Sequence, residues 1–259
     1  MSDAPSFDEP HPPAQDESTD PMFAPEIVGP TVDLLSELAR GGRALELGIG
    51  TGRVALPLAA RGIDVAGIDQ SETAARRLQA TPGGERIPVT IGDFATTRVE
   101  GTFSLVYLVY NTIMNLTTQA AQVDCFRNAA AHLGRGGVFL IETMIPDLRR
   151  LPPGDRFVPF DVSDGHVGID EYDVASQGLV SHHFERVGGG WNRSSGPFRY
   201  VWPSELDLMA RIAGMRLRDR WAGWRREPFT SESRSHISVW EKPTGRIGDH
   251  PGELGGVPT

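Results

Sequence analysis

The sequence predicts an α/β fold with a doubly wound, mostly parallel sheet, and a second, β-rich part inserted into that fold. Buried-strand patterns alternate with helical patterns through the first half of the chain, as in proteins built from βαβ units. The apolar strand at 44–47 runs into a glycine-rich turn and then into a helical pattern. Between 147 and 200, short alternating runs replace the helical periodicity, which is typical of antiparallel strands.

Helices are expected where apolar residues recur three and four positions apart between start and stop signals. Pro30 suits the first position of the first helix, and the glycines at 41–42 end it. Pro57 falls early in the next helix and indicates a kink or a first-turn position. Ser71 is the natural N-cap of the third helix. The expected helices are 30–40, 53–61, 71–80, 118–133 and one that runs from 203 to a stop at Gly214.

Strands are expected where short apolar runs are bounded by turn residues. The run 103–110 is strongly apolar, so it indicates a central strand buried on both faces. Within the inserted part, 178–187 and 191–200 flank three glycines, which indicates a hairpin. The expected strands of the main sheet are 44–47, 65–69, 87–91, 103–110, 138–142, 217–224 and 236–241.

Composition excludes several classes of protein. The net charge is −9, and the first 20 residues contain six acids and no Lys or Arg, so the chain lacks the basic surface expected of a nucleic-acid-binding protein. No apolar run approaches the ~20 residues of a membrane span. The single Cys125 excludes an intrachain disulfide framework and a thiolate zinc cluster. We therefore expect a cytoplasmic monomer or homodimer that has no nucleic-acid, membrane or metal partner.

The glycine-rich turn decides among ligand classes by its spacing. The dinucleotide fingerprint is G-x-G-x-x-G, but here Arg53 stands where its third glycine should be. The Lys of a phosphate-binding Walker loop is absent. Instead, the stretch 46–52, ELGIGTG, resembles the first motif of class I S-adenosylmethionine-dependent methyltransferases. That cofactor carries no phosphate, and its methionine end is cationic, which an acid at Glu46 would favour.

The resemblance spans about 30–242 and implies a Rossmann-like, seven-stranded sheet closed by an antiparallel last strand. It also implies a β-rich lid after the fifth strand, a layout similar to amino-sugar N-methyltransferases. We expect 21–146 and 201–242 to form the methyltransferase core and 147–200 to form the lid. Residues 1–20, an acidic tail, and 243–259, rich in Gly and Pro, are expected to be disordered.

Two further acids fit the resemblance. Asp69 ends the second strand, 21 residues after Gly48, where an acid can accept from both ribose hydroxyls; the alternative is a cap of the next helix. Asp93 and Phe94 follow the third strand, where the family contacts adenine; the alternative is an ordinary Asx turn. The full set of implied cofactor contacts is Glu46, Gly48, Ile49, Gly50, Gly52, Asp69, Gln70, Asp93, Phe94 and Tyr110.

Candidate catalytic residues follow the central strand and lie in the lid. Ligands bind beyond the carboxyl ends of parallel strands, so Tyr110 and Asn111 are placed near the reacting methyl group. Tyr107 is expected to be a core residue with a satisfied hydroxyl. Glu142 ends the fifth strand and either faces the pocket or is a solvated acid. The Asn/Asp-Pro-Pro-Tyr tetrad of enzymes that methylate nucleic-acid bases is absent here.

His182 is the third candidate catalytic residue. Alternate residues of a strand share a face, so Val180, His182 and Phe184 are expected to point inward and His183 toward water. An inward imidazole could take a proton from the acceptor, since its pKa lies near working pH. The alternative is a core histidine that is hydrogen-bonded to backbone.

These features predict transfer of a methyl group from S-adenosylmethionine to N or O of a small-molecule acceptor, by in-line displacement at the sulfonium. Two alternatives stay open at this stage: a nicotinamide-dependent oxidoreductase and a non-catalytic S-adenosylmethionine-binding protein. The sequence does not identify the acceptor.

Overall fold

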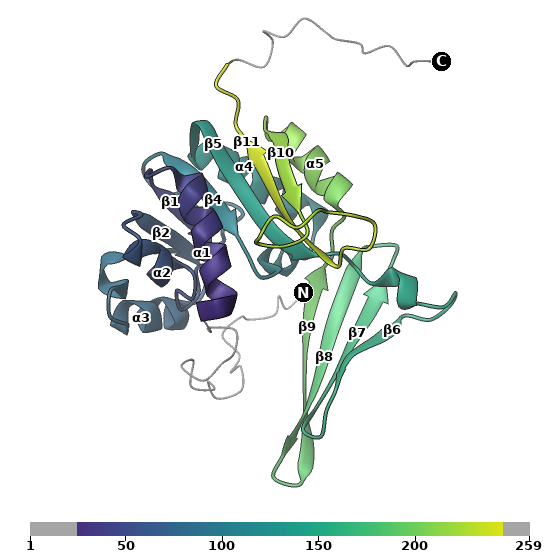
Figure 1. The fold of residues 1–259 in the computed structure, drawn as a ribbon. Coiled ribbons are helices and arrows are strands. Elements are labelled where there is room, and N and C mark those ends of the chain that lie inside the picture. Colours follow the sequence, from purple (N-terminus) through teal and green to yellow (C-terminus); the bar gives the residue numbers. More distant parts are fainter. Residues whose placement is uncertain (1–24, 246–259) are drawn as a thin grey trace, which may run out of the picture.

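The computed structural model describes residues 25–245, which form two sheets (Figure 1). The expected tail at 1–20 lies outside the described residues, as does most of the one at 243–259. Sheet A has seven strands in the order β10-β11-β5-β4-β1-β2-β3, and sheet B has four in the order β6-β7-β8-β9. The strands of sheet A are β1 (Ala44–Leu47), β2 (Val65–Asp69), β3 (Val89–Ile91), β4 (Phe103–Leu108), β5 (Leu133–Met144), β10 (Arg216–Trp221) and β11 (Ser235–Glu241).

Sheet A is the predicted doubly wound sheet. Strands β1 to β5 pair in parallel, whereas β11 pairs antiparallel with both β5 and β10. This arrangement confirms the seven-stranded, mostly parallel sheet with an antiparallel last strand. The strand order reverses between β1 and β4, so their carboxyl ends lie at the switch point where such sheets bind ligands.

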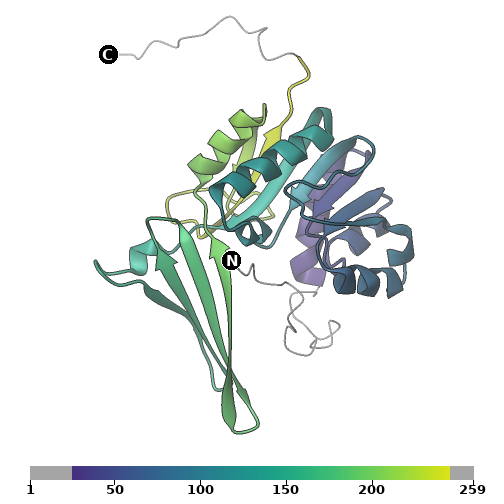
Figure 2. The ribbon, with the colours of Figure 1, turned by 180° about the vertical axis from the view of Figure 1, so that it is seen from behind.

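Helices cover both faces of sheet A (Figures 1 and 2). The helices α1 (Pro25–Ala39) and α2 (Ala55–Ala60) lie on one face, and α4 (Gln119–His132) and α5 (Pro203–Ile212) on the other; α3 is Glu72–Ala80. Two apolar clusters, one on each face, form the core. The predicted caps at Ser71 and Thr118 are confirmed, since their side chains accept from the backbone N–H groups of Ala74 and Ala121.

The predicted start of the first helix is wrong. Helix α1 begins at Pro25, and Pro30 lies inside it. Proline in a helix removes one hydrogen bond, but Val28, Val32 and Leu35 on either side of Pro30 are buried in the core. Packing of this apolar stripe therefore outweighs the lost hydrogen bond. Pro57 sits in the first turn of α2, which is one of the two arrangements expected for it.

Sheet B is the inserted β-rich part and projects from the edge of the core where β5 ends (Figure 1). Its antiparallel strands are β6 (Phe157–Val162), β7 (His166–Asp173), β8 (Gly178–Val187) and β9 (Gly190–Arg199). Its base packs on the core through Val158, Tyr172 and Leu179. Sheet B is therefore the expected lid-like insertion after the fifth strand.

At the base of β8 the face that packs on the core is not the predicted one, although His182 itself is buried, as predicted, and His183 is half-buried. Leu179 pairs with Tyr172 on one side and Phe198 on the other, and these apolar residues carry that face onto the core. The face of Val180 and His182 is therefore the opposite one. Both faces of β8 begin with an apolar residue, so only the partners on β7 and β9 decide between them.

Candidate functional site

The glycine-rich turn between β1 and α2 forms the floor of the site. Gly48 and Gly50 have φ angles of +74° and +56°, which favour glycine. The N–H of Gly48 donates to the Ile68 carbonyl at 2.8 Å and so ties the turn to β2. A Cβ at Gly48 would lie 2.7 Å from Thr112 Cγ2, whereas one at Gly50 would meet no described atom within 4 Å. Gly50 therefore presents bare backbone to open space.

A cavity of about 170 Å³ lies above this turn. It is enclosed by the end of β1, the glycine-rich turn, the start of α2 and the segment after β4. Of the predicted cofactor contacts, Glu46, Gly48, Ile49, Gly50 and Tyr110 line it. The remaining lining residues are Thr51, Arg53, Val54, Val109 and Thr112.

Glu46 gives the cavity a buried acid. Its Oε2 accepts a hydrogen bond from the Tyr107 hydroxyl at 2.9 Å, so Tyr107 is the predicted core residue with a satisfied hydroxyl. Burial raises the pKa of Glu46 to about 8, and this effect exceeds the opposing effects of Tyr107 and Arg53. The acid is therefore mostly protonated at pH 7, and a cation bound beside it would favour its ionised form.

Asp69 joins the glycine-rich turn to α3. Its Oδ2 accepts from the Gly50 N–H at 2.7 Å, and its Oδ1 accepts from the Ser71 N–H at 2.9 Å. A carboxylate has about four lone-pair sites, so these two bonds leave acceptor capacity for a ligand. Gln70, the neighbouring predicted contact, is exposed.

The loop after β3 carries the predicted adenine contacts. Asp93 Oδ1 accepts from the Ala95 N–H at 2.8 Å, which is the geometry of the Asx turn named as the alternative. Phe94 is buried in the core. Neither residue lines the cavity, nor do Gly52 and Asp69.

Helix α4 holds this loop in place through two buried polar side chains. Asn128 Nδ2 donates to the Phe94 and Thr97 carbonyls at 2.8 and 2.9 Å. His132 Nε2 accepts from the Val99 N–H at 2.9 Å, which requires the proton of a neutral ring on Nδ1, 2.9 Å from the Asn128 carbonyl. Burial lowers the pKa of His132 and so favours this neutral form.

Tyr110 and Asn111 form a strained turn at the end of β4. Their φ angles of +56° and +60° are uncommon for residues other than glycine. The end of β5 fixes them, since Glu142 Oε2 accepts from the Tyr110 N–H at 2.5 Å and Asn111 Oδ1 accepts from the Met144 N–H at 2.6 Å. Glu142 thus faces inward, and burial raises its pKa.

Arg53 is a cavity residue whose importance sequence reasoning missed. Its guanidinium carbon lies 3.3 Å from the centre of the Tyr110 ring, close enough for a cation–π contact. Its charge also lowers the pKa values of Glu46 and Glu142 against the effect of burial. The sequence clue was a cation directly after the glycine motif, seven residues after the acid Glu46.

His182 lies in sheet B and does not line the cavity. Its Nδ1 is 2.8 Å from Ser195 Oγ, and its Nε2 is 3.2 Å from Glu171 Oε2. His183, expected to face water, contacts His166 through ring nitrogens 3.0 Å apart. The structure thus places Tyr110 in the cavity wall, with Asn111 beside it in the same turn, and leaves His182 away from the cavity.

Within 25–245, no three His, Cys, Asp or Glu side chains gather closely enough to hold a metal ion. None of the helices in this range has the length and apolar character needed to cross a membrane.

Several known proteins with similar sequences and structures are methyltransferases. A family model described as a methyltransferase domain matches residues 44–137. The cypemycin N-terminal methyltransferase of a Streptomyces species is 28% identical over 207 residues, which are 78% of this chain and 84% of that protein. The CcbJ methyltransferase from Streptomyces caelestis is 36% identical, with a TM-score of 0.75 over 83% of this chain and 88% of its own.

A second solved structure shares the fold at lower identity. CalS10, an amino pentose methyltransferase from Micromonospora echinaspora solved with S-adenosylmethionine bound, is 18% identical, with a TM-score of 0.62 over 84% of this chain and 90% of its own.

The fold and the cavity define an α/β enzyme that binds its cofactor at the carboxyl edge of a parallel sheet. The similarity to CcbJ over most of both chains shows the family of this enzyme: the chain belongs to the class I S-adenosylmethionine-dependent methyltransferases. Its cofactor is S-adenosylmethionine, and its reaction is methyl transfer. Of the alternatives left open by the sequence, nicotinamide-dependent oxidation is therefore not its function.

Proposed function

We propose that this enzyme methylates a nitrogen or oxygen of a small-molecule acceptor that binds between the cavity and sheet B. The observation that carries the proposal is the pairing of bare backbone at Gly50 with the buried acid Glu46 in one cavity. S-adenosylmethionine fits this pairing, because its methionine end is cationic and it has no phosphate to be neutralised. The bound cofactor supplies a methyl group on a positively charged sulfur.

In this proposal, four acidic or aromatic residues bind different parts of the cofactor. Glu46 lies at the floor of the cavity and receives the ammonium group. Asp69, with lone pairs left after its bonds to Gly50 and Ser71, accepts from the ribose hydroxyls. Asp93 and Phe94 are assigned to the adenine. The remaining assigned contacts, which shape the turn around the cofactor, are Gly48, Ile49, Gly50, Gly52, Gln70 and Tyr110.

The chain's own contribution to the rate would be positioning and exclusion of water. The sulfonium is already activated, so alignment of the acceptor and desolvation carry most of the catalysis. Tyr110 and Asn111 are assigned to the acceptor side, because their strained turn lines the cavity and faces the part of the core from which sheet B projects. A base is needed only if the acceptor arrives protonated, and His182 is the candidate for that role.

The names of similar proteins favour nitrogen as the acceptor atom. The cypemycin enzyme is named for an N-terminus, and CalS10 for an amino sugar. We therefore propose an amine as the first acceptor class to test. We also propose a cytoplasmic location, which agrees with the free, buried Cys125.

A pair of glycine variants tests the cofactor site. Gly50→Ala adds a methyl group in the cavity at a φ of +56°. Gly62→Ala is the matched control, because its φ is +84° and its Cβ also meets no described atom within 4 Å, but it lies at the end of α2. Calorimetric titration with S-adenosylmethionine should show affinity lowered about tenfold by the first change and unaltered by the second. Equal affinities in both variants would contradict the site.

The acceptor itself is found by product analysis. The enzyme is incubated with S-adenosylmethionine labelled in its methyl group and an extract of small metabolites from the source organism. Mass spectrometry should show the label on an amine-containing molecule, and no such product with Gly50→Ala at limiting cofactor. Label found only on protein or nucleic acid would contradict a small-molecule acceptor.

A further inference from the structure

One end of the sheet B insertion is hydrogen-bonded directly, and the other through Gln122, to one short segment beside the cofactor cavity, residues 110–113, here called the cavity turn. Where the insertion leaves β5, Asn111 Oδ1 accepts from the Met144 N–H at 2.6 Å. Where the insertion returns to the core after β9, Gln122 Nε2 donates to the carbonyls of Ile113 and Arg199 at 3.2 and 3.1 Å. The cavity turn thus lies between the two ends of the insertion.

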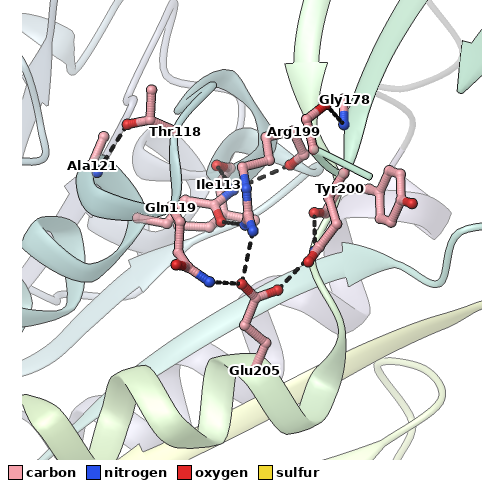
Figure 3. A network of polar contacts seen from close by, with 11 residues as sticks. Ile113, Thr118, Gln119, Ala121, Gly178, Arg199, Tyr200 and Glu205 are labelled. Carbon is pink, nitrogen blue, oxygen red and sulfur yellow. Dashed lines mark hydrogen bonds and ion pairs between the residues drawn. The ribbon is translucent and has the colours of Figure 1, made fainter. Parts of the chain in front are cut away.

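Gln122 is the bridge on the return side; Figure 3 shows the surrounding network, with Ile113, Arg199 and Glu205 labelled. It belongs to α4, and its side chain is completely buried. Besides its two donor bonds, its Oε1 accepts from Arg199 Nη1 at 2.5 Å. A single buried amide therefore contacts both Arg199, the last residue of β9, and Ile113, the last residue of the cavity turn.

The same network fixes Arg199, so the bridge has a rigid end. Arg199 is buried, and its Nη2 donates to Glu205 Oε1 at 2.8 Å. Burial opposes ionisation of Glu205, but hydrogen bonds from Arg199, Gln119 and Gln177 outweigh it and hold its pKa below the usual value. Gln177 also donates to the Tyr200 carbonyl at 3.0 Å. The return end of sheet B is therefore anchored to the core by a buried ion pair.

The cavity turn needs such support. Tyr110 and Asn111 are both in the left-handed region, and residues held there persist only when their surroundings over-determine the conformation. Their neighbours from the rest of the chain include Arg53 and the end of β5, and the bridge from β9 reaches the same turn at Ile113. A displacement of sheet B would loosen the turn that places Tyr110 and Thr112 in the cavity wall.

We infer that Gln122 is a positioning residue that couples the placement of sheet B to the shape of the cofactor cavity. Because sheet B covers the acceptor side in the proposed function, on which this inference rests, the coupling makes acceptor and cofactor binding mutually supportive. A thermodynamic coupling of this kind is reciprocal.

Gln122→Met tests the coupling, because it keeps the length of the side chain and removes every polar atom. Gln119→Met is the matched control: it lies three residues earlier on α4, is exposed, and donates to Glu205 at 2.7 Å but makes no bond to Ile113. The two readouts are amide hydrogen exchange of peptides covering 110–116 and 178–199, and calorimetric affinity for S-adenosylmethionine.

We expect Gln122→Met to speed exchange in 110–116 and to weaken cofactor affinity about tenfold, while Gln119→Met leaves both unchanged. Exchange in β1 and β2 should not alter, which separates the coupling from a general loss of stability. If Gln122→Met does not fold, Gln122→Glu keeps an acceptor for Arg199 and loses both donors, and the same changes are expected. Unaltered exchange and affinity in the folded Gln122 variant would overturn the inference. Failure of the wild type to bind S-adenosylmethionine would instead overturn the proposed function, and exchange alone would then decide on the coupling.

Discussion

The Glu46→Gln variant should abolish a proton release that accompanies cofactor binding. Glu46 is buried at the floor of the cavity beside Tyr107, and burial raises its pKa to about 8. It is therefore mostly neutral at pH 7 before the cofactor arrives. The ammonium group of the cofactor would stabilise the ionised carboxylate, so binding should expel the proton.

The size of the effect follows from the pKa. A group with a pKa of about 8 is roughly nine-tenths protonated at pH 7, so full ionisation on binding releases about 0.9 proton. Cofactor affinity should consequently rise with pH up to about 8. The same shift affects the free energy of unfolding. Raising the pKa of Glu46 from the usual 4.5 to about 8 changes this free energy by roughly 5 kcal/mol across that pH range, at about 1.4 kcal/mol per pKa unit.

The sign of the stability effect is fixed by the raised pKa. The folded chain binds this proton more tightly than the unfolded chain, so the stabilisation is fully present below pH 4.5 and is lost as pH rises toward 8. The melting temperature of the cofactor-free protein should fall over this range, and Glu46→Gln should flatten the fall.

Calorimetry in two buffers of different ionisation enthalpy measures the proton release directly. At pH 7 the wild type should release about 0.9 proton, and Glu46→Gln should release close to none. Tyr107→Phe is the control that keeps the carboxyl: the proton should still be released, because loss of the hydroxyl removes a group that lowers the pKa of Glu46. Equal proton release in wild type and Glu46→Gln would refute the reasoning.

Three further substitutions test other parts of the site. Asp69→Ala should weaken S-adenosylmethionine binding by about 2–4 kcal/mol, the scale of lost charge-assisted hydrogen bonds; unchanged calorimetric affinity would remove Asp69 from the site. His132→Phe leaves the Val99 N–H without its acceptor and should lower the free energy of unfolding by about 1–3 kcal/mol in urea titrations; an unshifted midpoint would show that the loop does not depend on α4. If His182 is the base, His182→Asn should cut turnover about 10²-fold while His183→Asn does little; normal turnover in both would disprove the assignment.

The parts of the fold that depend on local signals were predictable. The bounds of β2 and β8 match the predicted 65–69 and 178–187, because turn residues on both sides mark their ends. The glycine-rich turn was predictable for the same reason, since only backbone conformations open to glycine connect β1 to α2 at this point. The capping residues of α3 and α4 act within one turn of the helix they begin.

The parts of the fold and of the site that depend on distant partners were not predictable from the sequence. The inward face of β8 is decided by Tyr172 and Phe198 on neighbouring strands. The true start of α1 is decided by apolar packing that offsets Pro30. The contact of Arg53 with Tyr110 joins residues 57 positions apart, and the inward orientation of Glu142 depends on the backbone of a turn after another strand. Sequence periodicity contains no information on such pairings.

A crystal structure of the enzyme with S-adenosylhomocysteine tests the central claim most directly. The methionine end of the ligand should occupy the cavity, with its ammonium group beside Glu46 and its sulfur directed toward Tyr110. The ribose should extend beyond the cavity, with its hydroxyls within hydrogen-bond distance of Asp69. The adenine should lie against Asp93 and Phe94. Density for the methionine end outside this cavity, or in it with the ammonium group away from Glu46, would contradict the account.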